Sequence, residues 1–144
     1  MMGEASCDVH KLVADVAAVA GGKVLLVRYK DVAGYDGQTG WFLPDDHLRF
    51  EEHPRDAARR ILKEQAGIVA QVDDLRHIES FAGGAKGAWH LIFHYKVALK
   101  TAKAPVPGDN VREAKWFPLD AMPPRKEVAH GGWAIDVVGE IRGT

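Results

Sequence analysis

The stretch from Asp46 to Ile68, DHLRFEEHPRDAARRILKEQAGI, decides the fold of this 144-residue chain. Its second half predicts a helix, because Pro54 suits a first helical turn and Gly67 suits the left-handed residue that follows a helix. Small or apolar side chains and one glutamine recur at a spacing of three and four residues. They are Ala57, Ala58, Ile61, Leu62 and Gln65. We expect this face of the helix to pack into the core.

The same stretch resembles the Nudix box in its spacing. In that pattern a glycine, five residues and a glutamate are followed, after seven residues, by Arg-Glu-apolar-x-Glu-Glu-x-Gly-apolar. The matching residues are Glu52, Arg60, Leu62, Glu64, Gly67 and Ile68. The departures are Asp46 for the opening glycine, Ile61 for the glutamate after the arginine, and Gln65 for the last glutamate of the pair. The spacing indicates the scaffold, and the departures fall where the family holds its metal ions.

The elements around the box extend this resemblance to the Nudix superfamily over nearly the whole chain. Two apolar runs, Leu12–Ala20 and Lys23–Tyr29, are separated by Gly21-Gly22. This predicts a hairpin, because paired glycines supply the positive φ angles of a two-residue turn. A glycine-rich loop, Asp31–Gly40, then precedes a short strand, Trp41–Pro44, which we expect to end at its proline.

The rest of the chain adds strands and one more helix. These elements are strands at Leu75–Ala82, Ala88–Leu99 and Arg112–Phe117, a helical turn at Leu119–Met122 and a helix at Ala129–Ile141. The segment GGAKG, with Lys86, predicts a plain hairpin turn. In the strand after it, Trp89 begins an aromatic face that we expect to be the buried one. His90 and His94 share the other face but stand about 13 Å apart, too far for one metal ion.

The resemblance implies an α+β fold, a Nudix-like α/β/α sandwich with a mixed β-sheet between helices. The predicted domain organisation is a single Nudix-like domain over residues 1–144. Its length agrees, because 144 residues are enough to bury one core. With 47% hydrophobic and 27% charged residues, the composition is that of a globular protein.

Charge and hydropathy limit the partners. A formal net charge of −1 gives no overall field to attract nucleic acid, so no nucleic-acid partner is expected. No apolar run approaches the roughly 20 residues that span a bilayer, and the first residues lack the features of a secretory signal. The single cysteine, Cys7, excludes an internal disulfide and predicts a free thiol. We therefore expect a cytoplasmic protein.

The resemblance implies a hydrolase that cleaves a pyrophosphate bond in a nucleoside diphosphate-linked substrate, with Mg²⁺ or Mn²⁺ as cofactor. Cations neutralise the phosphate oxygens and activate water, and carboxylates hold the cations. Glutamates at positions 61, 64 and 65 would share one helix face, but only Glu64 is present. The resemblance assigns Glu64 as metal ligand and catalytic residue, Glu52 as auxiliary metal ligand, and Arg60 as the group that orients them.

Two alternatives remain open. The loss of two box glutamates favours a non-catalytic Nudix-fold module that binds a nucleotide or has a regulatory role, with Ile61 simply a core residue. A redirected hydrolase would take its base from a loop, with His47 and Glu113 as candidates. The sequence indicates no substrate-binding residues and leaves the oligomeric state open, a homodimer included.

Overall fold

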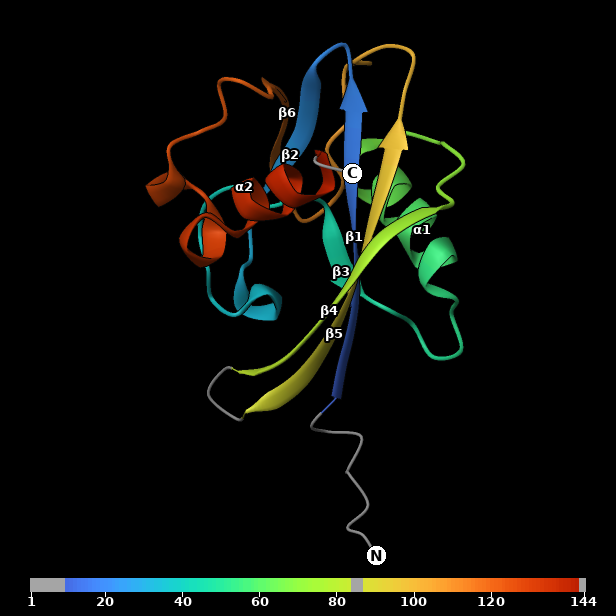
Figure 1. Cartoon of the computed structure of the whole chain (residues 1–144), viewed down its shortest axis with the longest axis vertical. Helices are drawn as coiled ribbons and strands as arrows, with labels where there is room; N and C mark the ends of the chain where they lie inside the picture. The colour runs from blue at the N-terminus through green and yellow to red at the C-terminus, as the bar shows by residue number, and fades with distance from the viewer. Residues whose placement is uncertain (1–9, 84–86, 143–144) are drawn as a thin grey trace, which may run out of the picture.

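The computed structural model describes residues 10–83 and 87–142, which form a mixed six-stranded sheet with two α-helices (Figure 1). In chain order the elements are β1 (His10–Ala20), β2 (Lys23–Tyr29), a 3-10 turn (Ala33–Tyr35), β3 (Asp45–His47), α1 (Pro54–Ala66), β4 (Asp74–Gly83), β5 (Ala88–Ala98), β6 (Val111–Pro118), a second 3-10 turn (Arg125–Glu127) and α2 (Ala129–Arg142). Cys7 and Lys86 lie outside the described residues. No helix within the described ranges is long and apolar enough to cross a membrane.

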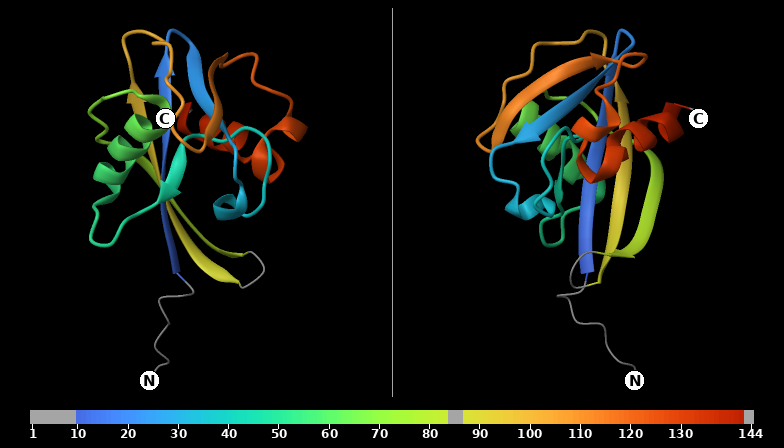
Figure 2. Two further views of the ribbon diagram at one scale, coloured as in Figure 1. Left: turned by 180° about the vertical axis from the view of Figure 1, so that it is seen from behind. Right: turned by 90° about the vertical axis from the view of Figure 1, so that its left-hand side faces the viewer.

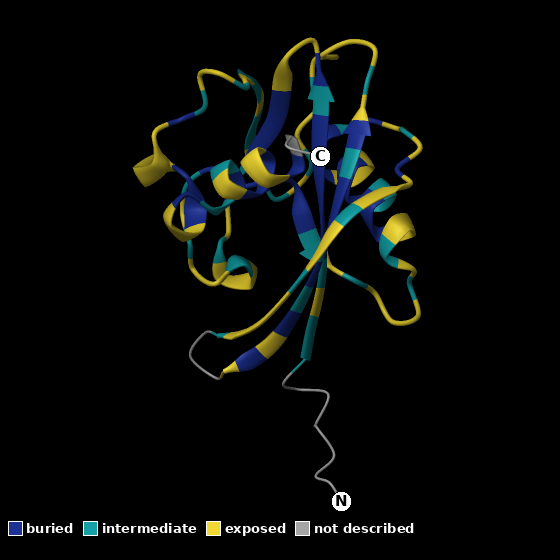
Figure 3. Ribbon diagram, viewed as in Figure 1, coloured by how far each residue is buried: buried dark blue, intermediate teal, exposed yellow. Residues whose placement is uncertain are grey.

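The sheet separates two cores. Its strand order is β4-β5-β1-β2-β6, β1 and β5 run parallel, and β3 pairs with β1. Val16 and Ala18 of β1 face α1, whereas Ala17 faces α2. The two helices therefore cover opposite faces of the sheet (Figure 2), and buried residues run through the central strands (Figure 3). The predicted α/β/α sandwich with a mixed sheet is confirmed.

The predicted hairpin is also confirmed, and its geometry makes room for the site. Gly21 and Gly22 have φ angles of 55° and 74°, as a two-residue turn requires. Beyond the turn, β1 and β2 pair only at Val19↔Val24 and Ala20↔Lys23. The two strands then diverge (Figure 1), and the segment 41–47 runs in the space between them.

The strand predicted at Trp41–Pro44 lies later in the chain. Within that range only isolated bridges form, and β3 begins after Pro44, with Asp45 opposite Asp15 of β1. Pro44 accepts a hydrogen bond from the Val16 N–H at 3.1 Å but has no N–H to donate, so the ladder with β1 starts after it. Asp45 and Asp46 therefore lie in an extended strand.

Helix α1 has the predicted boundaries and the predicted buried face. Gly67 follows it at φ 67°, and its N–H reaches the carbonyl oxygens of Leu62 and Lys63. His53 caps its first turn by accepting a hydrogen bond from the Arg55 N–H at 3.0 Å. All five side chains of the predicted stripe are buried, so the helix is held to the sheet by its apolar face.

The chain between β6 and α2 differs from the prediction. The segment expected as a helical turn, Leu119–Met122, forms a single hydrogen-bonded turn instead, in which the Ala121 N–H donates to the Pro118 carbonyl at 3.0 Å, and a 3-10 turn comes after the two prolines, at Arg125–Glu127. A helical turn before them would need N–H donors at positions 123 and 124, which proline lacks. Helix α2 then begins with three left-handed residues, His130, Gly131 and Gly132, which bend its first turn.

The prediction of a buried aromatic face on β5 is confirmed only for the second half of the strand. Tyr95 is 3% exposed and Phe93 packs against the core under α1, but Trp89 is 46% exposed. On the other face, His90, Ile92 and His94 are 8%, 7% and 1% exposed, so both faces are covered near the end of the strand. Hydrophobicity alone could not reveal the burial of His94, because its polar partners, Asp15 and Glu79, come from other strands.

We predict that Ile61→Ala lowers the free energy of unfolding by about 3 kcal/mol, and Ile61→Val by about 1 kcal/mol. The reason is that Ile61 is fully buried against Ala14 and Ala57, so truncation leaves a cavity. Urea unfolding measures both values. The exposed Lys63→Ala on the same helix is the control and should change stability by less than about 0.5 kcal/mol. Equal effects of the two alanine variants would contradict the packing role.

Candidate functional site

Arg60 is the centre of a polar network between α1 and the segment before it. Its Nε and Nη2 donate to the two carboxylate oxygens of Glu52 at 2.8 and 3.0 Å. Nη2 also donates to the carbonyl oxygen of His47 at 3.1 Å. The hydrogen bond from Arg60 lowers the pKa of Glu52, and the one to Glu52 raises the pKa of Arg60. With side chains only 13% and 14% exposed, this bidentate pair fixes the entry into the helix.

Glu64, the acid that remains from the box trio, has both oxygens occupied. Arg60 Nη1 donates to Oε1 at 3.0 Å, and Arg49 Nη2 donates to Oε2 at 3.1 Å. The Glu64 side chain is 48% exposed, so solvent screens these pairs more than the pair with Glu52. A divalent cation at Glu64 would have to displace a guanidinium or lie beside both.

Gln65 belongs to a closed network of neutral hydrogen bonds. Its Oε1 accepts from the Tyr29 hydroxyl at 2.8 Å, and its Nε2 donates to the Asp45 carbonyl at 2.8 Å. The Asp45 N–H in turn donates to the Tyr29 hydroxyl at 3.2 Å. A glutamate carboxylate has no proton for the Asp45 carbonyl, so this arrangement requires the amide at position 65.

These contacts test whether the box suits the divalent cations that its pattern implies. A cluster of cations needs several carboxylates that are free to coordinate. Ile61 lies in the core, both ends of the Gln65 amide are engaged, and Glu64 is paired with two arginines. In the described part of the chain, no group of three or more His, Cys, Asp or Glu side chains is placed to hold a metal ion. The donor set does not fit a multi-metal centre.

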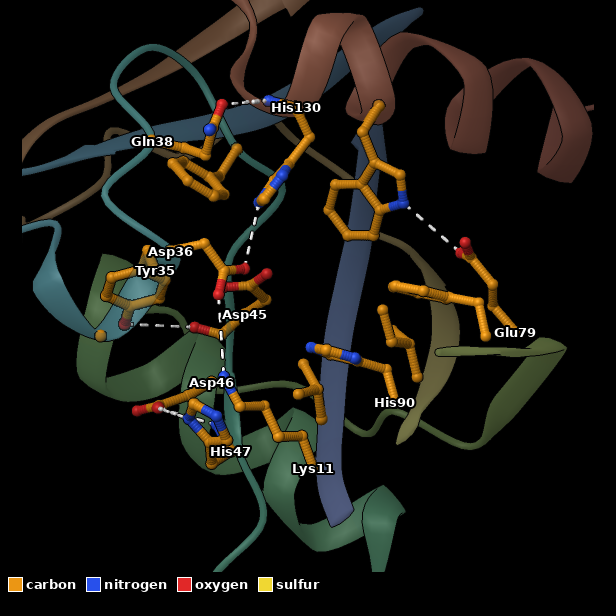
Figure 4. A pocket seen from close by; sticks show the side chains of 16 residues that line it. Lys11, Tyr35, Asp36, Gln38, Asp45, Asp46, His47, Glu79, His90 and His130 are labelled. Atoms are coloured by element: carbon orange, nitrogen blue, oxygen red, sulfur yellow. Dashed lines mark hydrogen bonds and ion pairs between the residues drawn. The ribbon is translucent and has the colours of Figure 1, made fainter. Parts of the chain in front are cut away.

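A cavity of about 570 Å³ lies on the α2 side of the sheet (Figure 4). Its walls come from β1, β3, β4 and β5, from residues 34–38 and from the start of α2. Its aromatic and histidine lining includes Tyr35, Phe42, Phe81, His90, His130 and Trp133. In Figure 4, Asp36 and Asp45 lie on one side of this space and Glu79 on the other.

A row of ionisable side chains crosses the sheet beside this cavity. The parallel register of β1 and β5 places Asp15 opposite His94. His94 Nδ1 lies 2.7 Å from Asp15 Oδ2, and His94 Nε2 lies 2.9 Å from Glu79 Oε1. Trp133 Nε1 donates to the same Glu79 oxygen at 3.4 Å. Asp15 and His94 are buried, whereas the Glu79 side chain is 33% exposed and reaches the cavity.

Burial and neighbouring charges set the protonation of this row. Burial raises the pKa of Asp15 more than His94 lowers it. Burial alone would lower the pKa of His94, but Asp15 and then Glu79 outweigh it and raise that pKa to about 9. His94 is therefore protonated at neutral pH and donates both ring N–H groups to carboxylates. Burial, followed by the charge of Asp15, raises the pKa of Asp45 well above its usual range.

The structure brings some of the sequence-predicted residues together and separates others. Glu52, before α1, forms one network with Arg60 and Glu64 of the helix. His47, at the end of β3, joins this network through its carbonyl oxygen and lines the cavity, but Glu113 lies on β6 and pairs with Arg28 at 3.6 Å.

Asp15, Glu79 and His94 were not predicted as a site. One signal was available: Asp15 interrupts the otherwise apolar run LVADVAAVA, and aspartate is rarely buried without a partner. The identity of that partner follows from the strand register, which the sequence does not state.

Comparisons with known proteins agree with the fold. The family model described as NUDIX domain matches residues 9–135 of the chain. None of the curated proteins compared with the chain matches it. The three solved structures described next are each less than 25% identical to this chain, so they show the fold alone.

Three solved structures are similar to this chain over most of its length. A MutT NUDIX hydrolase from Burkholderia pseudomallei has a TM-score of 0.72 and 21% identity, and the match covers 90% of this chain and 98% of that one. A NUDIX hydrolase from Nitrosomonas europaea has a TM-score of 0.74 and 16% identity, covering 92% and 88%. The NUDIX domain of Shewanella oneidensis NrtR, solved with ADP ribose, has a TM-score of 0.70 and 20% identity, covering 94% and 89%.

We predict that Gln65→Glu lowers the free energy of unfolding by about 2 kcal/mol, because a carboxylate oxygen then faces the Asp45 carbonyl in a buried place. Millimolar Mn²⁺ should restore part of this stability, since two facing oxygens attract a cation. Thermal unfolding with Mn²⁺ and with EDTA measures both effects. Lys63→Glu, on the exposed side of the same helix, is the charge control. Equal stabilisation of the wild type and Gln65→Glu by Mn²⁺ would contradict the role of the amide.

The raised pKa of His94 predicts a pH dependence of stability. A group whose pKa is about 9 in the folded state and 6.5 in the unfolded state stabilises the fold fully below pH 6.5, and this contribution disappears as pH rises through 9. Urea unfolding should show a loss of about 3 kcal/mol over this interval, absent in His94→Gln and retained in His77→Gln. An NMR titration of the His94 ring checks this without substitution, and a pKa near 6.5 would contradict it.

Proposed function

The chain belongs to the Nudix family, and on that basis we propose that it is a Nudix-fold nucleotide-binding module rather than a multi-metal hydrolase. The observation that carries the proposal is the amide of Gln65, engaged by Tyr29 and by the Asp45 carbonyl where the box pattern has a glutamate. Together with the burial of Ile61, it leaves Glu64 as the one carboxylate of the trio.

The number of available ligands supports this proposal more than the arginine pairs do. Each exposed pair on Glu64 contributes only about 0.2–1 kcal/mol, which a bound cation can overcome. The carboxylates at positions 61 and 65, by contrast, are absent from the sequence, so the helix face itself cannot supply them. The Shewanella domain, solved with ADP ribose, supports a small nucleoside diphosphate-linked ligand for this chain as well.

The second candidate is the hydrolase itself, with a site reduced to one cation. It is favoured by the contacts of Arg60, which holds Glu52 and Glu64 through the same guanidinium. Glu64 would be the main ligand and Glu52 the auxiliary one, with Arg60 orienting both. Magnesium often binds through one or two carboxylates and completes its shell with water and phosphate oxygens. A Mg²⁺ or Mn²⁺ ion would supply charge neutralisation and an activated water.

One experiment separates the two candidates. ADP-ribose, nucleoside triphosphates and dinucleoside polyphosphates are incubated with the protein in Mn²⁺, in Mg²⁺ and in EDTA, with binding measured by calorimetry and products by chromatography. We predict binding of at least one ligand that is unchanged by EDTA, and no release of phosphate or nucleoside monophosphate. Glu64→Gln should then bind as the wild type does.

The opposite result would establish the hydrolase. It consists of metal-dependent release of phosphate or nucleoside monophosphate that stops in EDTA and in Glu64→Gln. Glu140→Gln, an exposed glutamate on α2 far from the box, is the matched control and should hydrolyse as the wild type does in that case.

A further inference from the structure

The cavity on the α2 side has walls suited to a flat ring. Trp133 and Tyr35 line it, and Phe81 stacks on His90 with ring centroids 4.7 Å apart and an angle of 3° between the rings. Its volume of about 570 Å³ lies within the usual range for small-molecule sites, about 300–1,000 Å³. Aromatic faces favour planar aromatic ligands, which stack on them.

The charge of the cavity is acidic. Its lining carries the carboxylates of Asp36, Asp46 and Glu79 and one lysine, Lys11, while the raised pKa of Asp45 favours a neutral carboxyl there. Lys11 lies 3.7 Å from Asp36, and the cations nearest the other two, Arg60 at 3.9 Å from Asp46 and His94 at 2.9 Å from Glu79, lie outside the lining. Phosphate groups deep in this space would face negative charge. The part of a ligand that enters it is therefore neutral or cationic and rich in hydrogen-bond donors.

Glu79 presents one oxygen to the cavity. His94 and Trp133 both donate to its Oε1, at 2.9 and 3.4 Å. No hydrogen bond from the described residues reaches Oε2, and the side chain is 33% exposed. Oε2 is thus an acceptor held in a fixed place with room for a ligand donor.

Asp15 and His94 are the buried members of the row of ionisable side chains, and they orient Glu79 at a cost in folding free energy. Asp15 Oδ1 is buried and makes no hydrogen bond within the described part of the chain, and an unsatisfied buried oxygen costs free energy. Apolar residues would pack this place without that cost. The visible consequence of Asp15 and His94 is the orientation of the Glu79 carboxylate, so we regard them as positioning residues.

His130, in the first turn of α2, lines the cavity on its helix side. It has the left-handed angles φ 53° and ψ 42°, which cost a residue with a side chain about 1 kcal/mol or more. Its N–H donates to Gln38 Oε1 at 3.1 Å, and its Nε2 lies 3.5 Å from Asp36 Oδ2. These contacts hold the start of α2 against Asp36 and Gln38 (Figure 4).

We propose that this cavity binds a flat nitrogen heterocycle that carries an amino or ring N–H group, with Glu79 Oε2 accepting a hydrogen bond from it. The inference rests on the proposed function in that the heterocycle is the base of the nucleotide-type ligand. The aromatic walls hold the ring, and the phosphate groups remain outside the acidic part of the cavity.

The test uses nucleosides, which contain no phosphate. Adenosine and guanosine carry an amino group on the base. Purine riboside lacks this donor and is the comparison probe. Calorimetric titration of the full chain should show binding of adenosine or guanosine about tenfold tighter than that of purine riboside. Glu79→Gln should weaken the tighter nucleoside about tenfold, because the acceptor loses its charge, and leave purine riboside unchanged. Glu140→Gln, the exposed control, should bind as the wild type does.

A spectroscopic readout tests the positioning role. The side-chain ¹⁵N resonances of His94 should shift when adenosine or guanosine is added to the wild type, and should not shift in Glu79→Ala. Absence of nucleoside binding at millimolar concentration, equal affinity for purine riboside, or wild-type affinity in Glu79→Gln would overturn the inference. Metal-dependent hydrolysis of ADP-ribose, by contrast, would overturn the proposed function and leave nucleoside recognition by Glu79 standing.

Discussion

The guanidinium of Arg60 joins helix α1 to the segment that leads into it, and the rest of the box depends on this contact. Its bidentate hydrogen bonds to Glu52 fix the loop, and its hydrogen bond to the carbonyl of His47 fixes the end of β3. Because β3 pairs with β1, this contact also determines where Asp45 meets the cavity. The arginine therefore has a structural role that requires no metal ion.

The departures from the Nudix box form a consistent set. The isoleucine at position 61 extends the apolar stripe of α1, and the glutamine at position 65 completes hydrogen bonds that a carboxylate would break. On the opposite face of the sheet, Asp15, His94 and Glu79 form a polar row of their own. The charged groups at the box helix are thus paired with one another, whereas Glu79 reaches the cavity on the other face.

The elements that were predicted correctly have local causes. Paired glycines specify the hairpin at residues 21–22, and proline, glycine and apolar spacing specify α1. Two of the errors occurred where distant segments decide. The strand after Pro44 starts where β1 offers an edge, and on β5 the fold covers His90 while Trp89 stays exposed. The third error, the turn before α2, has a local cause, because the two prolines lack the N–H groups that a helical turn needs.

The sequence by itself determined the box helix, the hairpin and the family fold, because residue spacing and backbone preferences act over a few neighbouring residues. It also showed which box acids are missing. The tertiary structure alone decided that Gln65 meets the Asp45 carbonyl and that Asp15 meets His94 and Glu79. Residues 79 positions apart become partners only through the register of a parallel strand pair, and no local pattern encodes that register.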